Sequence, residues 1–232
     1  MSILISVGIL ILAMLIMALL QLVPGIFALF SHYALGKFKQ AKAYDFMLFF
    51  ILGVETITAC LFLCVYYLTF VFRFGEADFI NRIFAWILAG IMIALSLSSL
   101  FFYFRRGSGT KLFISRKTAQ ALDHNAKISK TRSDAFLLGT ISETYELFFT
   151  FPLYIIVALT VTQINFSAPG LLAFLFILAP LIPLFCLYWR YRSSYNLANI
   201  IKSRTNNKNF IRFLLFISYL FLAFLILYTG VA

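Results

Sequence analysis

Three glutamates lie inside stretches of the chain that are otherwise apolar. Glu143 and Glu146 are three residues apart within LLGTISETYELFFTFPLYII, and Glu55 lies in an earlier apolar stretch. A carboxylate is costly to place in hydrocarbon, so such groups face the interior of a helix bundle and take a partner, a proton or water. Carboxylates placed in this way could bind a proton or a cation reversibly.

Helical spacing places two of these glutamates on one face of a helix, together with a glycine and a threonine. Gly139, Glu143, Glu146 and Thr150 recur at intervals of three and four residues, which is the spacing of one helical face. Desolvation and mutual repulsion push two carboxyls at this spacing toward sharing a proton. We interpret the pair either as an ion-coupling site or as a protonated, hydrogen-bonded structural pair.

Polar and small residues form comparable stripes on the first three apolar stretches. Small residues let helices approach closely, and polar ones hydrogen-bond between helices. The stripes are Gln21, Gly25, Ala28 and His32; Glu55, Thr56 and Ala59; and Gly90, Ala94 and Ser98. We therefore expect a polar pocket among the first, second and fourth apolar stretches. The residues expected to bind its ion or substrate are Glu143, Glu146, Glu55, Gln21 and Thr150.

Prolines interrupt three of the apolar stretches. QLVPG places Pro24 and Gly25 in the first, FTFPLY places Pro152 in the fourth, and APLIPLF places Pro180 and Pro183 in the fifth. A proline removes one backbone hydrogen bond, and a carbonyl freed at mid-membrane can coordinate a cation or bind a polar substrate. Simple kinks in packed helices are the alternative. The residues expected to break helices or line a path are Pro24, Gly25, Gly139 and Pro152.

The elements that carry these residues are predicted to be membrane-spanning helices. The chain has 232 residues, of which 63% are hydrophobic and only 12% charged. A helix needs about 20 apolar residues to cross a bilayer, and six windows of this kind occur, at about 3–30, 45–72, 81–104, 135–162, 168–189 and 210–231. The sequence therefore predicts an all-α integral membrane protein whose residues 1–232 form a single transmembrane domain.

The basic residues predict how the chain is oriented. Seventeen of the nineteen lie in or beside the first, third and fifth connections, including the basic loop 105–133. Because basic loops face the cytoplasm, both termini are expected outside. The net charge of +11 favours anionic lipid head groups as partners and not nucleic acid, because the basic residues lie next to span ends.

The loop 105–133 divides the chain into two halves of three spans each. Its middle is expected to form a basic amphipathic helix on the inner membrane surface. Since three is odd, the halves enter the membrane from opposite sides, which is the geometry of inverted repeats in secondary transporters. No sequence repeat between the halves is evident.

Two short motifs resemble the LysE superfamily of small six-span exporters, including its cadmium-resistance branch. They are LLQLVPGIFALF in the first span and LLGTISETYELFFTFPL in the fourth. The resemblance pairs a Pro-Gly element with an acidic element ahead of an apolar Pro-Leu. It implies that Pro24, Gly25, Glu143 and Glu146 line a translocation path.

The sequence thus predicts a small secondary transporter or exporter that is coupled to protons or cations, in a bacterial cytoplasmic membrane that it crosses several times. A small cation or polar solute would be the cargo, and assembly as a homo-oligomer is left open. No enzyme activity and no cofactor are expected, because there is no H-E-x-x-H motif, no phosphate-binding loop and no complete catalytic set. The sequence leaves metal binding unknown. The alternative is a structural or accessory subunit of a membrane complex.

Overall fold

The computed structural model describes residues 3–34, 40–72, 78–101, 124–125, 131–163, 169–192 and 197–231. Within these ranges the backbone is helical except at Thr131 and at the turn formed by Ala179 and Pro180. The expectation of an all-α protein is therefore confirmed. The long elements are α1 (Ile3–Ala34), α2 (Gln40–Phe72), α3 (Asp78–Phe101), α5 (Arg132–Gln163), α6 (Pro169–Leu178), α7 (Leu181–Arg192) and α8 (Leu197–Val231).

Three of the described helices are long and apolar enough to cross a membrane, over Leu4–Gln21, Asp45–Val71 and Ile83–Leu100. Helix α5 would make a fourth if its two segments, Arg132–Thr144 and Glu146–Thr162, form one bent span. Shorter apolar segments cover Gly170–Cys186 and Phe213–Tyr228. The composition and these lengths are those of a membrane protein, whereas the full set of six spans stays a prediction.

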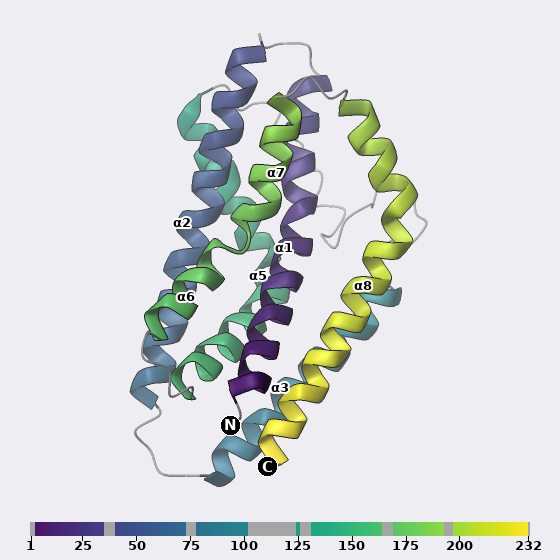
Figure 1. Cartoon of the computed structure of the whole chain (residues 1–232). Helices are drawn as coiled ribbons and strands as arrows, with labels where there is room; N and C mark the ends of the chain where they lie inside the picture. The colour runs from purple at the N-terminus through teal and green to yellow at the C-terminus, as the bar shows by residue number, and fades with distance from the viewer. Residues whose placement is uncertain are drawn as a thin grey trace.

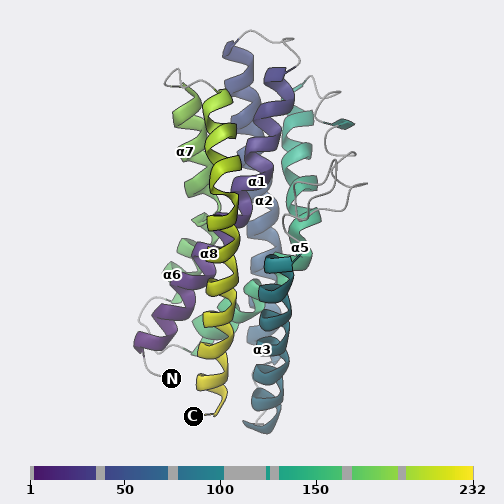
Figure 2. The ribbon, with the colours of Figure 1, turned by 90° about the vertical axis from the view of Figure 1, so that its right-hand side faces the viewer.

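The helices form an elongated bundle in which helices far apart in the sequence lie side by side. Helix α2 packs chiefly on α5, α3 packs chiefly on α8, and α1 lies between them with contacts to α8, α5, α7 and α2. Figure 2 shows α3 and α8 running along one flank of the bundle. The two ends of the chain lie at the same end of the molecule (Figure 1). The bundle is thus held together by contacts between its first and second halves.

The fifth apolar stretch is split into two helices. Helix α6 ends at Leu178 and α7 begins at Leu181. Pro180 has no amide proton with which to continue the α-helical ladder, and the amide of Ala179 instead donates to the carbonyl oxygen of Phe176 at 3.1 Å. The interruption expected from Pro180 is therefore present.

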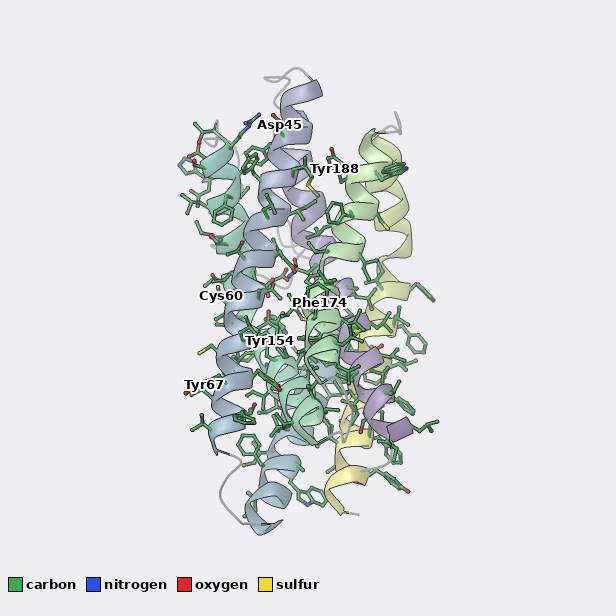
Figure 3. The ribbon with its side chains drawn as sticks, turned by 60° about the vertical axis from the view of Figure 1, so that its left-hand side comes forward. Asp45, Cys60, Tyr67, Tyr154, Phe174 and Tyr188 are labelled. Atoms are coloured by element: carbon green, nitrogen blue, oxygen red, sulfur yellow. The ribbon has the colours of Figure 1, made fainter. Side chains whose placement is uncertain are left out.

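The described surface of the bundle carries many large apolar side chains. Large side chains such as Phe148 (75% exposed) and Trp189 (71% exposed) point outward, and Figure 3 shows Cys60 and Tyr67 on the outer side of α2. A protein that exposes this much apolar surface needs an apolar solvent around it. Lipid is the solvent that fits helices of this length.

Some of the expected packing stripes do not face the bundle. On α2, the Thr56 side chain is exposed and its hydroxyl donates to the carbonyl oxygen of Leu52 at 2.7 Å. On α3, Gly90 and Ala94 are exposed, and a methyl group at Gly90 would meet open space. The prediction for α3 was wrong because the partner of α3 is α8, which packs on a different face of that helix. On α2 the prediction fails for Thr56, whereas Glu55 and Ala59 of the same stripe are half-buried.

Helices α2 and α5 approach each other closely at two glycines. A Cβ atom at Gly53 would overlap the carbonyl oxygen of Phe136, and one at Gly139 would overlap that of Phe50. Because backbone atoms fill both places, a larger residue at either glycine would force the two helices apart. This contact lies one turn from Glu143 and fixes α5 against α2 next to the glutamates.

Candidate functional site

Three helices bring polar side chains together inside the bundle. Glu143 and Glu146 of α5 are 0% and 4% exposed, and Gln21 of α1 is fully buried beside them. The Gln21 amide nitrogen donates to Oε2 of Glu143, and it lies 3.2 Å from Oε2 of Glu146. One amide group therefore bridges both carboxyls.

Tyr154 supplies a second donor to the pair. Its hydroxyl donates to Oε1 of Glu143 at 2.7 Å, and its side chain is completely buried. Figure 3 shows Tyr154 directed into the bundle near the crossing of α2 and α5. Glu143 thus accepts hydrogen bonds from two helices, whereas Glu146 accepts only the longer contact from Gln21.

The bend of α5 makes this arrangement possible. Its segments Arg132–Thr144 and Glu146–Thr162 meet at 69°, so Glu143 lies on one side of the bend and Glu146 on the other. The bend is two turns before Pro152, which lies inside the second segment and is buried. The sequence had pointed to Pro152 as the breaking residue.

Hydroxyl groups line the walls of the same site. Thr150 is fully buried, lies beside the Glu143 carboxylate, and donates to the carbonyl oxygen of Glu146 at 3.4 Å. Thr58 of α2 is buried next to Tyr154. The hydroxyl oxygen of Ser142 is buried and has no hydrogen-bond partner.

Glu55 forms the edge of the site on α2. Its carboxyl is half-buried and lies within electrostatic range of Glu143. One of its oxygens, Oε2, is buried without a hydrogen-bond partner. All five residues predicted to bind an ion or substrate therefore fall in one region.

The predicted path-lining residues are placed less uniformly. Gly139 contacts the α2 backbone, which is a packing contact, and its place on a path stays a prediction. Pro24 and Gly25 belong to α1, but their side-chain surroundings lie outside the described residues. The same holds for most of the basic loop 105–133, including its expected amphipathic helix.

No positive side chain neutralises the glutamates among those described. Neither Glu143 nor Glu146 has an ion pair there, and the spanning stretches Leu4–Gln21 and Ile83–Leu100 contain no ionisable residue. The ion pair between Arg132 and Asp45, 2.6 Å long, lies at the beginnings of α5 and α2. In the described part of the chain, no three His, Cys, Asp or Glu side chains are grouped to hold a metal ion.

An aromatic cluster adjoins the site. Phe62 of α2 and Phe176 of α6 have ring centroids 5.0 Å apart, and Tyr154 packs edge-on against both, at 6.2 and 6.0 Å. All three rings are fully buried. The carbonyl oxygen of Phe176 accepts the hydrogen bond from Ala179 at the end of α6. The aromatic cluster therefore connects the break between α6 and α7 to Tyr154, which donates to Glu143.

Sequence reasoning missed Tyr154. It continues the stripe Gly139, Glu143, Glu146, Thr150 by one more turn, and that periodicity was the available signal. In a straight helix, Tyr154 would lie too far from Glu143, eleven residues earlier, for their side chains to meet.

The chain matches no model of a known protein family, no curated protein and no solved structure. The resemblance to the LysE superfamily therefore stays a prediction that rests on the two short motifs.

Proposed function

We propose that this protein is a small secondary transporter or exporter, coupled to protons or cations, that works through the carboxyl pair of Glu143 and Glu146. The observation that carries this proposal is that both carboxyls are buried and face one shared amide, without a basic partner among the described residues. Two buried carboxylates need a positive charge or a proton beside them. Reversible binding of that proton or cation would make the pair a coupling site.

A structural or accessory subunit is the second candidate. Its support is that Glu143 is fully enclosed and satisfied by Gln21 and Tyr154, as a purely structural pair would be. Against it stands the cost of burying a second carboxyl, because a glutamine at position 146 would pack equally well without a charge.

Six membrane passes and outward termini belong to this proposal. Both chain ends lie at one end of the bundle (Figure 1), as an even number of passes requires. The split fifth stretch and the end of α8 contribute the shorter apolar segments Gly170–Cys186 and Phe213–Tyr228. Basic residues gather in the first, third and fifth connections, which supports a cytoplasmic location for these connections.

Helix packing supports two halves of three spans. Helices α6 and α7 together correspond to the fifth predicted span, and the helix pairs considered are those with extensive contact. Exchanging α1 with α5, α2 with α6–α7, and α3 with α8 then leaves the set of contacting pairs unchanged among the described residues. The contact of α1 with α8, for example, becomes that of α5 with α3, and both exist. A pseudo-two-fold axis between inverted repeats has this consequence.

The position of the carboxyl pair between α1 and α5 supports the proposal. Gln21 of α1 meets Glu143 of α5, and α1 and α5 are partners in the exchange. Binding at the repeat interface lets one half rock against the other around a fixed site. The bend of α5 and the break between α6 and α7 are the places where the helices can deform. Export as the direction, and a bacterial cytoplasmic membrane as the location, follow from the LysE resemblance and the loop-poor chain.

Flux in proteoliposomes tests the proposal. Purified protein would be reconstituted with a pH-sensitive dye inside, and a pH gradient or a cation gradient imposed. Wild type should move protons or cations, and Glu143→Gln and Glu146→Gln should both reduce flux to that of empty liposomes. Thr144→Val is the matched control, because Thr144 lies on the same helix but is exposed and bonds only to the carbonyl of Thr140.

The opposite outcome favours the second candidate. If wild type moves no ion, and the two glutamine variants unfold at lower temperature than Thr144→Val, the glutamates serve structure. Flux that survives both substitutions would place the transport path elsewhere.

A further inference from the structure

The geometry of the carboxyl pair distinguishes between a proton and a metal or alkali cation as its ligand. A cation bound by both glutamates would lie between their oxygens. That position is held by the Gln21 amide nitrogen, which donates to Oε2 of Glu143 and lies 3.2 Å from Oε2 of Glu146. Because an N–H group presents positive charge, it competes with a cation for the same oxygens.

The two glutamates differ in their donors. Glu143 accepts from Gln21 and from Tyr154, the latter at 2.7 Å, and the Thr150 hydroxyl lies beside it. Glu146 has only the longer contact to Gln21. Hydrogen bonds to an ionised carboxylate stabilise its charge, so Glu143 is the better placed of the two to carry a negative charge.

The Gln21 amide also has an acceptor without a donor. The carbonyl oxygen Oε1 of Gln21 is buried and has no hydrogen-bond partner, and it belongs to the amide that bridges both glutamates. A buried acceptor without a donor is unfavourable. The Gln21 amide lies beside Glu146, with its nitrogen 3.2 Å from Oε2, so a proton on Glu146 would supply an O–H donor next to this amide.

We propose that Glu143 and Glu146 bind one exchangeable proton, that Glu146 carries it, and that Gln21 and Tyr154 hold Glu143 as the fixed carboxylate. The step is a simple protonation, in which Glu146 takes a proton from water and returns it, with no change of redox state. It rests on the proposed function and names the coupling ion of the same site. Gln21 and Tyr154 are positioning residues in this scheme.

Among the side chains that the structure describes, few ionisable groups lie around the pair. Glu55 faces it from α2, and Tyr154 lies on α5 itself. Helix α1 over Leu4–Gln21, α3 over Ile83–Leu100 and α6 contribute none. Glu55 is the described carboxyl that adjoins the pair, so a measurement of the pair has to remove its signal.

Infrared spectroscopy of purified protein in nanodiscs tests the proposal without any transport. The carbonyl stretch of a protonated carboxylic acid would be recorded at neutral pH in Glu55→Gln, and then in the same background with Glu146→Gln or Glu143→Gln. The band should be present in the first protein, absent with Glu146→Gln and retained with Glu143→Gln. A band that survives Glu146→Gln, or that is lost only with Glu143→Gln, overturns the assignment.

Two further measurements test the proposal without replacing either glutamate of the pair, and the second needs no variant beyond Glu55→Gln. Gln21→Leu in the Glu55→Gln background removes the acceptor and should shift the band to higher frequency, so an unchanged band counts against the proposal. Adding Na⁺ or Cd²⁺ at constant pH should leave the band in place. Its disappearance would show that a cation displaces the proton.

The results can be separated from those of the flux experiment. If the infrared band behaves as expected but the protein shows no flux, the exchangeable proton on Glu146 is supported and the proposed transport function is refuted. If the protein shows flux but no band that depends on Glu146, transport is supported and the assignment of the proton to Glu146 is refuted.

Discussion

The hydroxyl of Tyr154 donates a 2.7 Å hydrogen bond to Glu143, eleven residues earlier in the same helix. In a straight helix eleven residues span about 16 Å, which is more than the two side chains bridge together. A 69° bend lies between the two residues, at the junction of Thr144 and Glu146, and the hydrogen bond requires that it brings their side chains together. The bend and the hydrogen bond therefore depend on each other.

Tyr154→Phe should destabilise the protein by about 1.5–3 kcal/mol, because it removes a buried hydrogen bond to a charged group. The ring stays, so packing against Phe62 and Phe176 is retained. Unfolding in detergent followed by circular dichroism measures the effect. Tyr67→Phe is the control, since Tyr67 is exposed on α2; an equal loss in both variants would contradict the importance of the Glu143 contact.

Gln21→Leu should cost at least about 1–3 kcal/mol, because it leaves two buried acceptors without their shared donor. The same substitution in a Glu143→Gln, Glu146→Gln background should cost less, since neutral amides satisfy each other. A double-mutant cycle on unfolding free energies gives the coupling, expected at about 0.5–3 kcal/mol. Strict additivity would mean that Gln21 does not bridge the pair.

Gly139→Ala should lower stability by about 1–3 kcal/mol, because its methyl group would overlap the carbonyl oxygen of Phe50 and push α5 off α2. Gly90→Ala is the matched substitution, with open space around its new methyl group. It should be neutral or stabilising by up to about 1 kcal/mol, since alanine is the better helix former. Thermal unfolding of the two variants, measured side by side, tests this prediction. A similar change in stability in both variants would argue against the close contact at Gly139.

Phe176→Ala should cost about 3–5 kcal/mol, since it empties a fully buried ring position between α2, α5 and α6. Phe174→Ala, two residues earlier on α6, removes a ring that is 55% exposed and should change stability far less. Loss of Phe176 should also loosen Tyr154, so hydrogen exchange of the amides around Glu143 should become faster. Unaltered exchange there would separate the aromatic cluster from the carboxyl pair.

The amino-acid sequence by itself determined the helices and the polar residues within them. Runs of apolar residues are a local property, and the spacing of Gly139, Glu143, Glu146 and Thr150 follows from the pitch of one helix. Hence the all-α class and the stripe on α5 could be derived without a structure. Pro180 also acts locally, because it lacks an amide proton; a bend in the fifth stretch was accordingly expected, and the structure has a split between α6 and α7 there.

The tertiary structure decided which faces meet and where α5 bends. Small-residue stripes alone suggested that Thr56 and Gly90 pack inward, yet both are exposed, while Gly53 and Gly139 make the close contact. Tyr154 joined the site only through the bend. Helix pairing depends on interactions between residues far apart in the sequence, such as Gln21 with Glu143, and the periodicity within a single helix carries no information about them.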